Sequence, residues 1–246
     1  MVRVLVTGST DGLGLATAET LLSEGHDVIV HARSRQRVAA VRHLLERGAR
    51  CLVGDLADPA QVRRICDGAN RLGPLEAVIH NAGVLAGPTL VPVNVVAPYL
   101  MTALIPARRV VYLSSGMHRG GDARLSGLDW TGRAATASYS TSKLLVTTLS
   151  FAVARRLPDI LSNAVDPGWV PTRMGGPSAP DDLRLGHRTQ EWLATSSDPA
   201  ARTTGGYWYH QHTRAPHPAV EDHRFQEALL NDLADHTGVT LDALAP

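Results

Sequence analysis

The feature that most constrains the fold is a repeated alternation of short apolar runs with helix-forming segments. The first run, Val2 to Val6, is rich in β-branched residues and leads into a glycine-containing turn before a helix-forming segment. The same order recurs, with strands expected at residues 2–6, 27–31, 50–53, 75–80, 109–113, 160–165 and 206–209. Helices are expected at residues 13–23, 36–46, 58–72, 94–104, 137–157 and 221–236. Short connections between alternating strands and helices predict a doubly wound α/β fold, with a parallel sheet and helices on both faces.

We expect residues 1–246 to form a single domain of Rossmann type, because 246 residues suffice for one large core and no linker interrupts the pattern. Residues 116–136 are glycine-rich and predict a loop over the end of the sheet. Residues 173–205 predict a mobile flap with some helix, which would cover a substrate. Ligands of such sheets bind beyond the carboxyl ends of the strands, so the chemistry is expected on the loops that follow them.

Charge and cysteine content exclude several classes of protein. The 24 basic and 23 acidic side chains leave a net charge of +1, too little to attract nucleic acid or an anionic membrane surface. Cys51 and Cys66 are too few for a disulfide framework or a cysteine zinc site and suit a reducing compartment. The first apolar run is short and contains Arg3, unlike a signal peptide or membrane span. We therefore expect a cytoplasmic protein with no nucleic-acid partner and no membrane span.

The loop after the first strand has glycines spaced G-x-x-x-G-x-G. Glycine lets the backbone turn tightly and approach a pyrophosphate, whose charge is favoured by the amides at the start of the next helix. The alternative is an ordinary glycine turn between a strand and a helix. The expected dinucleotide-binding residues of this loop are Gly8, Ser9, Thr10, Asp11, Gly12, Leu13 and Gly14.

The end of the second strand indicates which dinucleotide is bound. An acidic residue there would bind a ribose 2′-hydroxyl, but the sequence is His31-Ala32-Arg33-Ser34-Arg35. Arg33, together with Arg35 or Arg37, suits a 2′-phosphate, so NADP(H) is preferred over NAD(H). The alternative is a solvated basic start to the next helix. Asp55, followed by Leu56, is a candidate for the adenine amino group or a simple turn aspartate.

Tyr139 and Lys143 are four residues apart in a predicted helix and therefore share one face. An ammonium near a phenol favours the phenolate, so we expect Lys143 to lower the pKa of Tyr139 from about 10. The pair would then exchange a proton with a substrate oxygen near neutral pH. Taken alone, such a pair is more often a surface accident.

Five motifs occur in order, each after a predicted strand or within a helix. They are the glycine loop at 7–14, Asn81-Ala82-Gly83, Ser114-Ser115, Tyr139-x-x-x-Lys143 and Asp166-Pro167-Gly168. Together they resemble the short-chain dehydrogenase/reductase family, closely over residues 2–172 and loosely over the last helix. The longer loop between Ser115 and Tyr139 resembles the retinol dehydrogenase-like branch.

The resemblance implies an NADP-dependent oxidoreductase that interconverts a carbonyl and an alcohol by hydride transfer, with a lipophilic ketone or aldehyde as substrate. It implies that Tyr139 is the acid/base, that Lys143 also holds the nicotinamide ribose, that Ser115 bonds the carbonyl and that Asn94 completes a proton relay. It further implies cofactor contacts from the loops after the fourth and sixth strands, at Asn81, Ala82, Gly83, Pro167, Gly168, Val170 and Thr172.

Some positions depart from the family pattern. His80 stands where a first asparagine is usual and is interpreted as a packing residue at a strand end. The segment between Asn94 and Ser115 is shorter than usual, and in this family its helix often builds the subunit interface. A homo-oligomer therefore remains one option rather than an expectation.

Other interpretations stay open. The fold is also compatible with a catalytically silent dinucleotide sensor or scaffold, and with an epimerase or dehydratase of the broader superfamily. The eleven histidines, His210, His212, His217 and His223 among them, lack a metal-binding motif, so no metal is expected. Residues 207–209 are expected in the core or in a pocket wall, and Trp169, Met174 and Trp192 are candidates for substrate contact.

Overall fold

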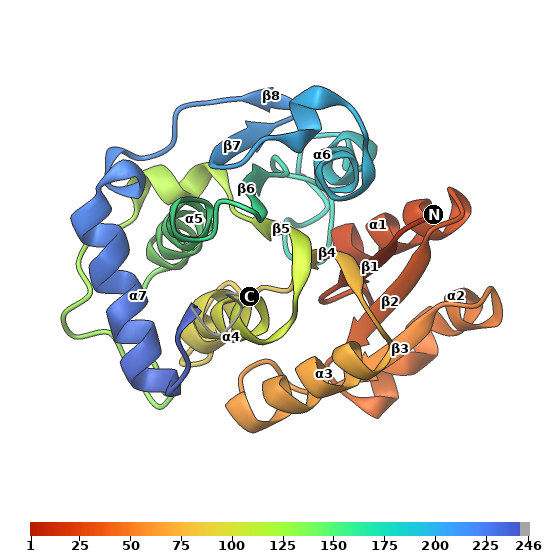
Figure 1. Ribbon diagram of the computed structural model, residues 1–246, viewed down its shortest axis with the longest axis horizontal. Helices are drawn as coiled ribbons and strands as arrows, with labels where there is room; N and C mark the ends of the chain where they lie inside the picture. The colour runs from red at the N-terminus through yellow and green to blue at the C-terminus, as the bar shows by residue number, and fades with distance from the viewer. Residues whose placement is uncertain (242–246) are drawn as a thin grey trace.

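The computed structural model describes residues 1–241 and contains one eight-stranded sheet with the strand order β3-β2-β1-β4-β5-β6-β7-β8 (Figure 1). All neighbouring strands are parallel except β7 and β8. The order runs outward in both directions from β1 and β4, which is the doubly wound arrangement. The predicted α/β fold is therefore confirmed. The strands are β1 (Arg3–Val6), β2 (Asp27–Ala32), β3 (Arg50–Val53), β4 (Leu75–His80), β5 (Ala107–Leu113), β6 (Leu161–Asp166), β7 (Gly206–Tyr209) and β8 (His212–Thr213).

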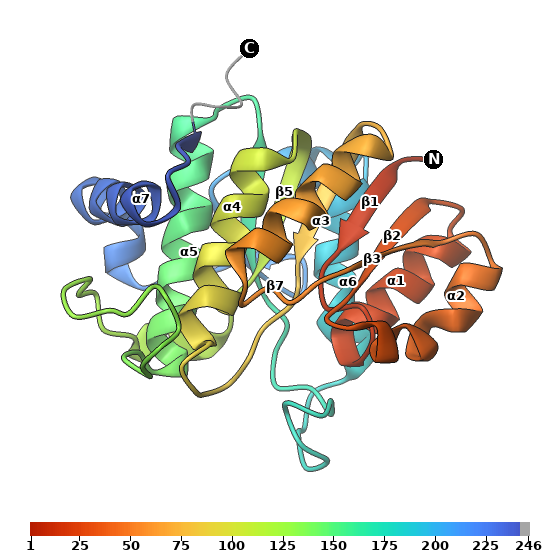
Figure 2. The same ribbon diagram turned by 90° about the horizontal axis from the view of Figure 1, so that it is seen from below.

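Helices cover both faces of the sheet (Figure 2). Apolar residues on alternate positions of each strand face opposite ways, so Leu5 joins one core cluster while Val4 and Val6 join the other. The first cluster lies under α3 (Pro59–Arg71), α4 (Ala97–Leu104) and α5 (Tyr139–Arg156), with α7 (His223–Thr237) packed on α5. The second lies under α1 (Gly12–Ser23), α2 (Arg42–Glu46) and α6 (Leu183–Thr195).

Two predicted helices are not regular α-helices over their whole length. The segment predicted at 36–46 begins as a 3₁₀ helix, η1 (Arg35–Val41), in which only Val41 is buried, so little packing enforces an α-helical turn. The segment predicted at 94–104 begins as a π-helical turn, η2 (Pro92–Val96), before α4. Pro98 has no N–H to donate to the carbonyl of Asn94, so the α-helical ladder is interrupted there.

The predicted flap at 173–205 consists of a loop, the helix α6 and a final segment that contains the 3₁₀ helix η4 (Pro199–Arg202). Residues 183–195 form α6, which packs against α1 and the sheet and buries Gln190, Leu193 and Ala194. The Gln190 amide donates to the Thr17 hydroxyl of α1 at 2.6 Å. The α6 part of the predicted flap is a core helix rather than a mobile cover. Residues 173–182 form the loop before α6, and that this loop covers a substrate stays a prediction.

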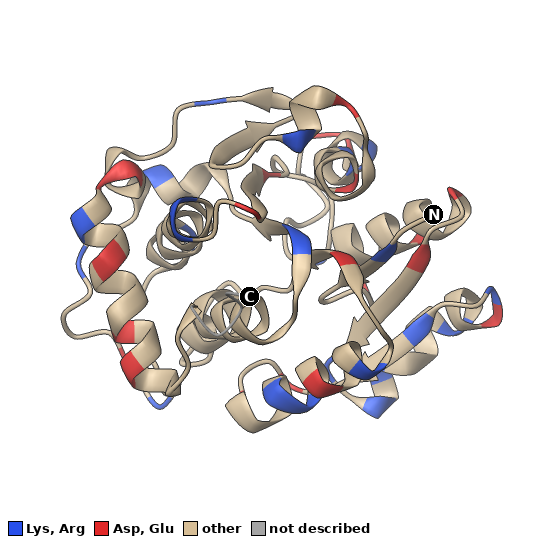
Figure 3. Cartoon of the chain, in the orientation of Figure 1, with Lys and Arg blue, Asp and Glu red and all other residues tan. Residues whose placement is uncertain are grey.

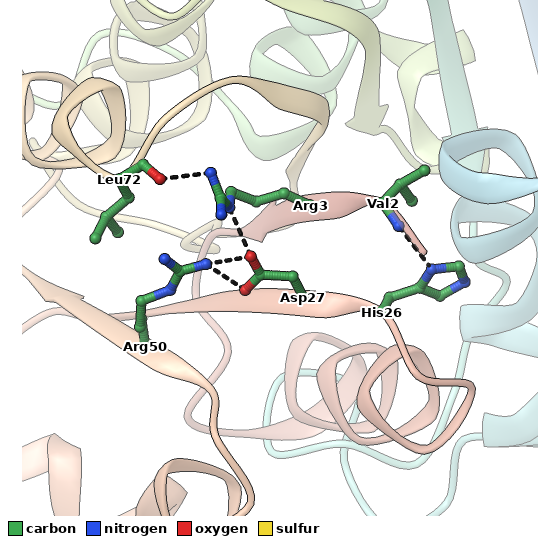
Figure 4. A network of polar contacts seen from close by, with 6 residues as sticks. All are labelled: Val2, Arg3, His26, Asp27, Arg50 and Leu72. Carbon is green, nitrogen blue, oxygen red and sulfur yellow. Dashed lines mark hydrogen bonds and ion pairs between the residues drawn. The ribbon is translucent and has the colours of Figure 1, made fainter.

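The amino edge of the sheet is held together by a charged network (Figure 4). Arg3 of β1 donates to the Asp27 carboxylate of β2 at 2.7 Å and to the Leu72 carbonyl, and Arg50 of β3 donates to both Asp27 oxygens. Burial opposes ionisation of Asp27, but the bonds to Arg50 and Arg3 outweigh it and lower its pKa. Elsewhere, basic and acidic residues are interspersed over the helices of both layers (Figure 3).

Candidate active site

The glycine loop after β1 packs tightly against the loop after β4. Gly8 has φ +65°, and a Cβ there would lie 2.9 Å from the Cα of Ala82. A Cβ on Gly14 would lie 2.3 Å from the Asn81 amide nitrogen and 2.5 Å from the Gly8 carbonyl oxygen. Only glycine fits at these two positions. The two glycines therefore let this loop pack closely against the loop after β4 at the start of α1, where a pyrophosphate is favoured.

Asn81 and Ala82 fasten the same loop. The Asn81 amide donates to the Thr7 carbonyl at 2.8 Å, and the Ala82 N–H donates to the Thr7 hydroxyl at 3.0 Å. Asp11 caps α1 by accepting from the Gly12 N–H at 2.8 Å. The structure thus brings the predicted residues of both loops together, and their contact with a dinucleotide stays a prediction.

A buried histidine that sequence reasoning did not single out completes this region. The Nδ1 atom of His31 accepts from the Gly8 N–H at 3.1 Å, and its Nε2–H donates to the Gly54 carbonyl at 2.9 Å. Burial lowers the pKa of His31, which keeps it in this neutral form. His31 joins the loops after β1 and β3. Its place at the end of a buried strand was the only signal in the sequence.

The predicted basic residues lie around the end of β2. Arg33 is exposed, whereas Arg37 donates to the Thr10 hydroxyl and lies 3.5 Å from the Asp11 carboxylate. An Asp55 oxygen accepts from the Ala57 N–H at 2.9 Å, as a turn aspartate does, and Leu56 is buried. Arg37 thus fastens the glycine loop itself, and Arg33 is the more accessible of the two.

Tyr139 and Lys143 stand at the start of α5, which Ser138 caps by accepting from the Thr141 N–H. The Lys143 ammonium donates to the Leu113 carbonyl at the end of β5 at 2.7 Å and lies 5.5 Å from the centre of the Tyr139 ring. Only 5% of the Lys143 surface is exposed. The pair therefore faces inward at the carboxyl edge, which argues against the surface-accident alternative.

Ser115 and Asn94 reach the same place from two other elements. The Ser115 hydroxyl accepts from the Met117 N–H at 3.2 Å and lies close enough to the Tyr139 phenol to lower its pKa. The Asn94 amide donates to the Ser142 hydroxyl at 2.9 Å, and its oxygen accepts from the Val84 N–H at 2.9 Å. Its π-helical turn is a feature found frequently at functional sites.

Gly83 marks where these groups meet, because a Cβ there would lie 3.4 Å from the Asn94 amide oxygen and 3.6 Å from the Lys143 ammonium. The four predicted catalytic residues therefore converge. Their roles stay predictions.

The electrostatics differ from the expected lowering of the Tyr139 pKa by Lys143. Burial raises the pKa of Tyr139 to about 12, the bond to Ser115 lowers it and the Asp166 carboxylate raises it further. Burial lowers the pKa of Lys143 to about 8, against the opposing effect of Asp166. The expectation was wrong for the protein alone, because burial dominates and the ammonium is directed at the Leu113 carbonyl.

The loop after β6 closes the site on the side of the glycine loop. The Gly168 N–H donates to an Asp166 oxygen at 3.0 Å, and the Trp169 N–H donates to Asp181 at 2.6 Å. A Cβ on Gly12 would lie 3.1 Å from the Thr172 side chain, so Thr172 reaches the start of α1. Val170 is buried beneath this loop. The predicted residues from Pro167 to Thr172 thus lie beside the other cofactor candidates.

Two of the C-terminal histidines, His212 and His217, form hydrogen bonds with the chain itself. The His217 N–H donates to Nε2 of His118 at 3.0 Å, and Nδ1 of His212 donates to the His210 carbonyl at 2.8 Å. Within residues 1–241, no group of three or more His, Cys, Asp or Glu side chains is arranged to hold a metal ion. None of the helices in that range has the length and apolarity to cross a membrane.

Comparison with known proteins places this geometry in a family. A sequence model described as short chain dehydrogenase matches residues 2–105. The short-chain dehydrogenase chry4 of Gibberella zeae is 36% identical over 98% of this chain and 99% of its own length. Human retinol dehydrogenase 14 is 31% identical, over 70% of this chain and 62% of its own, in agreement with the branch resemblance.

Solved structures agree with the fold. A protein from Mycobacterium paratuberculosis superposes with a TM-score of 0.79 at 24% identity, over 98% of this chain and 95% of that one. A blue fluorescent protein from a metagenomic library, in complex with NADPH, has a TM-score of 0.66 at 26% identity, over 85% of this chain and 95% of that one. With its ordered motifs, its topology and a relative matched over almost its whole length, the chain belongs to the short-chain dehydrogenase family of oxidoreductases.

Proposed function

We propose that this protein is an NADP(H)-dependent oxidoreductase that interconverts a carbonyl and an alcohol. The observation that carries the proposal is the convergence of Ser115, Tyr139 and Lys143 at the carboxyl edge of the sheet, beside the glycine loop. Proton donors on one side and a loop suited to a pyrophosphate on the other are what a reversible carbonyl reduction needs.

The chain supplies proton transfer and charge stabilisation. Bound nicotinamide supplies the hydride. The Ser115 hydroxyl donates to the carbonyl oxygen as negative charge grows there, and the Tyr139 phenol donates the proton that completes the alcohol. The Lys143 ammonium stabilises the phenolate that remains. The Asn94 side chain holds the backbone beside Lys143 through hydrogen bonds with the N–H and the carbonyl of Val84.

The preference for NADP(H) over NAD(H) rests on the basic end of β2. Arg33 is exposed directly after β2, where we expect a 2′-phosphate, and Arg37 is joined to the glycine loop through Thr10. The NADPH complex of a structural relative supports the same cofactor. The glycine loop suits the diphosphate of this cofactor, and the two arginines suit its 2′-phosphate.

Exposed apolar side chains support a lipophilic ketone or aldehyde as substrate. Large apolar side chains are usually buried, so several exposed ones in the segments after neighbouring strands favour an apolar ligand there. Five of the seven exposed in residues 1–241 follow the carboxyl ends of β4, β5 and β6, and they are Leu85, Met117, Trp169, Met174 and Leu185. We propose that these residues receive the apolar body of the substrate, with residues 173–182 as its cover.

The competing function is that of a dinucleotide sensor or scaffold without turnover. The convergence of all four predicted catalytic residues favours the enzyme, because a sensor has no need of a half-buried phenol and a buried ammonium beside the cofactor loop.

The deciding experiment incubates the purified protein with NADPH or NADH and a panel of lipophilic and polar ketones, aldehydes, quinones and steroids. Loss of the reduced-nicotinamide absorbance with the lipophilic members, faster with NADPH, is the expected result. Tight NADPH binding without turnover of any member would favour the sensor.

A further inference from the structure

Asp166, the last residue of β6, lies at the carboxyl edge of the sheet beside the predicted catalytic residues. In the β5–β6 register Leu113 is paired with Val165, and the Ser114 N–H donates to the Val165 carbonyl at 2.7 Å. Asp166 therefore ends β6 at the level where Ser114 and Ser115 follow β5. Leu113 also carries the carbonyl that binds Lys143, so the carboxylate and the ammonium flank the same strand ends.

The Asp166 carboxylate is buried and held from two sides. Only 7% of its surface is exposed. One oxygen accepts from the Gly168 N–H at 3.0 Å and the other accepts from the Tyr207 hydroxyl of β7 at 3.0 Å. A Cβ on Gly116 would lie 3.1 Å from the second oxygen, so the residue after Ser115 leaves room for it. The carboxylate therefore cannot turn away from the site without losing both bonds.

Other polar groups surround Asp166 on each packed element. From α5 the phenol of Tyr139 and the ammonium of Lys143 feel its charge. From η3 (Gly116–Gly120), the His118 ring lies 4.5 Å from the Tyr207 ring, and the Arg119 guanidinium lies 5.5 Å from the same ring centre.

His118 donates to the Ser115 carbonyl at 2.8 Å and accepts from the His217 N–H, and burial lowers its pKa. His118 is thus neutral. Arg119 lies over the Tyr207 ring, and Asp166 is the acidic group that acts on Tyr139 and Lys143 from this side.

We propose that Asp166 is a positioning residue, whose fixed carboxylate holds Lys143 as an ammonium and Tyr139 as a neutral phenol. This inference rests on the proposed function, because the protonated pair is the form that reduces a carbonyl. A buried ammonium loses its hydration and is disfavoured, and a nearby anion offsets that cost. Tyr207 and Gly168 hold the anion in place, and the same bond to Gly168 positions the loop expected to meet the nicotinamide.

The pH dependence of catalysis tests this role. For carbonyl reduction, kcat/KM is expected to fall at alkaline pH as Lys143 and Tyr139 lose their protons. In Asp166→Asn this fall is expected about 0.5 to 1 pH unit lower than in the unmodified enzyme, because both residues then lose their protons more easily. The matched control is Asp181→Asn. Asp181 accepts from the Trp169 N–H in the same loop. In Asp181→Asn the alkaline fall of kcat/KM is expected at the same pH as in the unmodified enzyme, even if KM changes.

A second measurement needs no activity. Lys143 is the single lysine of the chain, so a protein grown with ¹³C-labelled lysine gives one side-chain signal that reports its protonation by NMR. The titration midpoint of this signal is expected to move to lower pH in Asp166→Asn and to stay unchanged in Asp181→Asn. If Asp166→Asn does not fold, Asp166→Ser removes the same charge with a smaller side chain.

The outcomes separate the two proposals. An unmoved Lys143 midpoint in a folded, charge-removed variant overturns the role of Asp166, whatever the enzyme does. A moved midpoint in a protein that turns over no carbonyl or alcohol supports the electrostatic role and contradicts the proposed function.

Discussion

The two edges of the sheet treat partly buried charge in opposite ways. At the amino edge, charged side chains pair directly: Asp27 with Arg3 and Arg50, and Glu76 with Arg109 at 3.1 Å. At the carboxyl edge, Lys143 binds a backbone carbonyl, and Asp166 binds a backbone N–H and a phenol. In the direct ion pairs each charge is compensated by its partner, so these pairs contribute to the stability of the fold. The Asp166 charge, which is not paired with another charge, acts on the neighbouring Tyr139, and this suits a reaction.

The largest effect is expected from Tyr139→Phe. Removal of the hydroxyl deletes the proton donor, so turnover is expected to fall by about 10²- to 10⁴-fold. The affinity for NADPH, measured by titration calorimetry, is expected to change little because the phenol ring remains. Tyr99→Phe is the control, since the Tyr99 hydroxyl binds the Val239 carbonyl outside the site. Equal turnover in Tyr139→Phe and the unmodified enzyme contradicts the assignment.

The next effect concerns the cofactor. Arg33→Ala is expected to weaken NADPH binding about 10- to 100-fold and NADH binding by much less, because a charge-assisted bond to phosphate contributes about 1.5–3 kcal/mol. Arg42→Ala, another exposed arginine farther along the chain, is the control and should leave both affinities unchanged. A parallel loss for the two cofactors in Arg33→Ala would show that the phosphate is bound elsewhere.

At the amino edge the expected effect is on stability alone. Asp27→Asn removes the charge that joins β1, β2 and β3, so the free energy of unfolding in urea is expected to fall by about 1–2 kcal/mol with turnover unchanged. Because the folded-state pKa of Asp27 lies below its unfolded value, its contribution is present above pH ~4 and is lost as the pH falls further. A loss of turnover with stability unchanged would break the contrast between the edges.

The smallest effect comes from His80, which lies at the carboxyl end of β4 but faces the core. Burial lowers its pKa to about 3, and its Nε2 lies 3.1 Å from the Thr102 hydroxyl. Below pH ~6.5 the unfolded chain binds a proton that the folded chain does not, so His80 makes the free energy of unfolding fall by about 0.7 kcal/mol between pH 7 and 6. In His80→Asn this part of the slope should disappear. An identical slope in His80→Asn and the unmodified protein would show that another group causes the acid sensitivity.

The alternation of strands and helices was enough to predict the sheet, and the order of the motifs was enough to predict the family and the residues that converge on the site. Tyr139 and Lys143 share a helix face by spacing alone, and Ser115 and Asn81 follow strands whose carboxyl ends must meet. His31 and the Asp166–Tyr207 bond escaped prediction because each depends on contacts between residues more than twenty positions apart. The raised pKa of Tyr139 escaped it because spacing says nothing about burial.

The central claim is direct hydride transfer to a carbonyl that receives its proton from Tyr139. The most direct measurement is a single turnover with NADPH deuterated at the transferable position of the nicotinamide, followed by mass spectrometry of the alcohol. Direct hydride transfer predicts one deuterium on the carbinol carbon with the unmodified protein and almost no alcohol with Tyr139→Phe. An alcohol without deuterium, or equal yields from the two proteins, would contradict it.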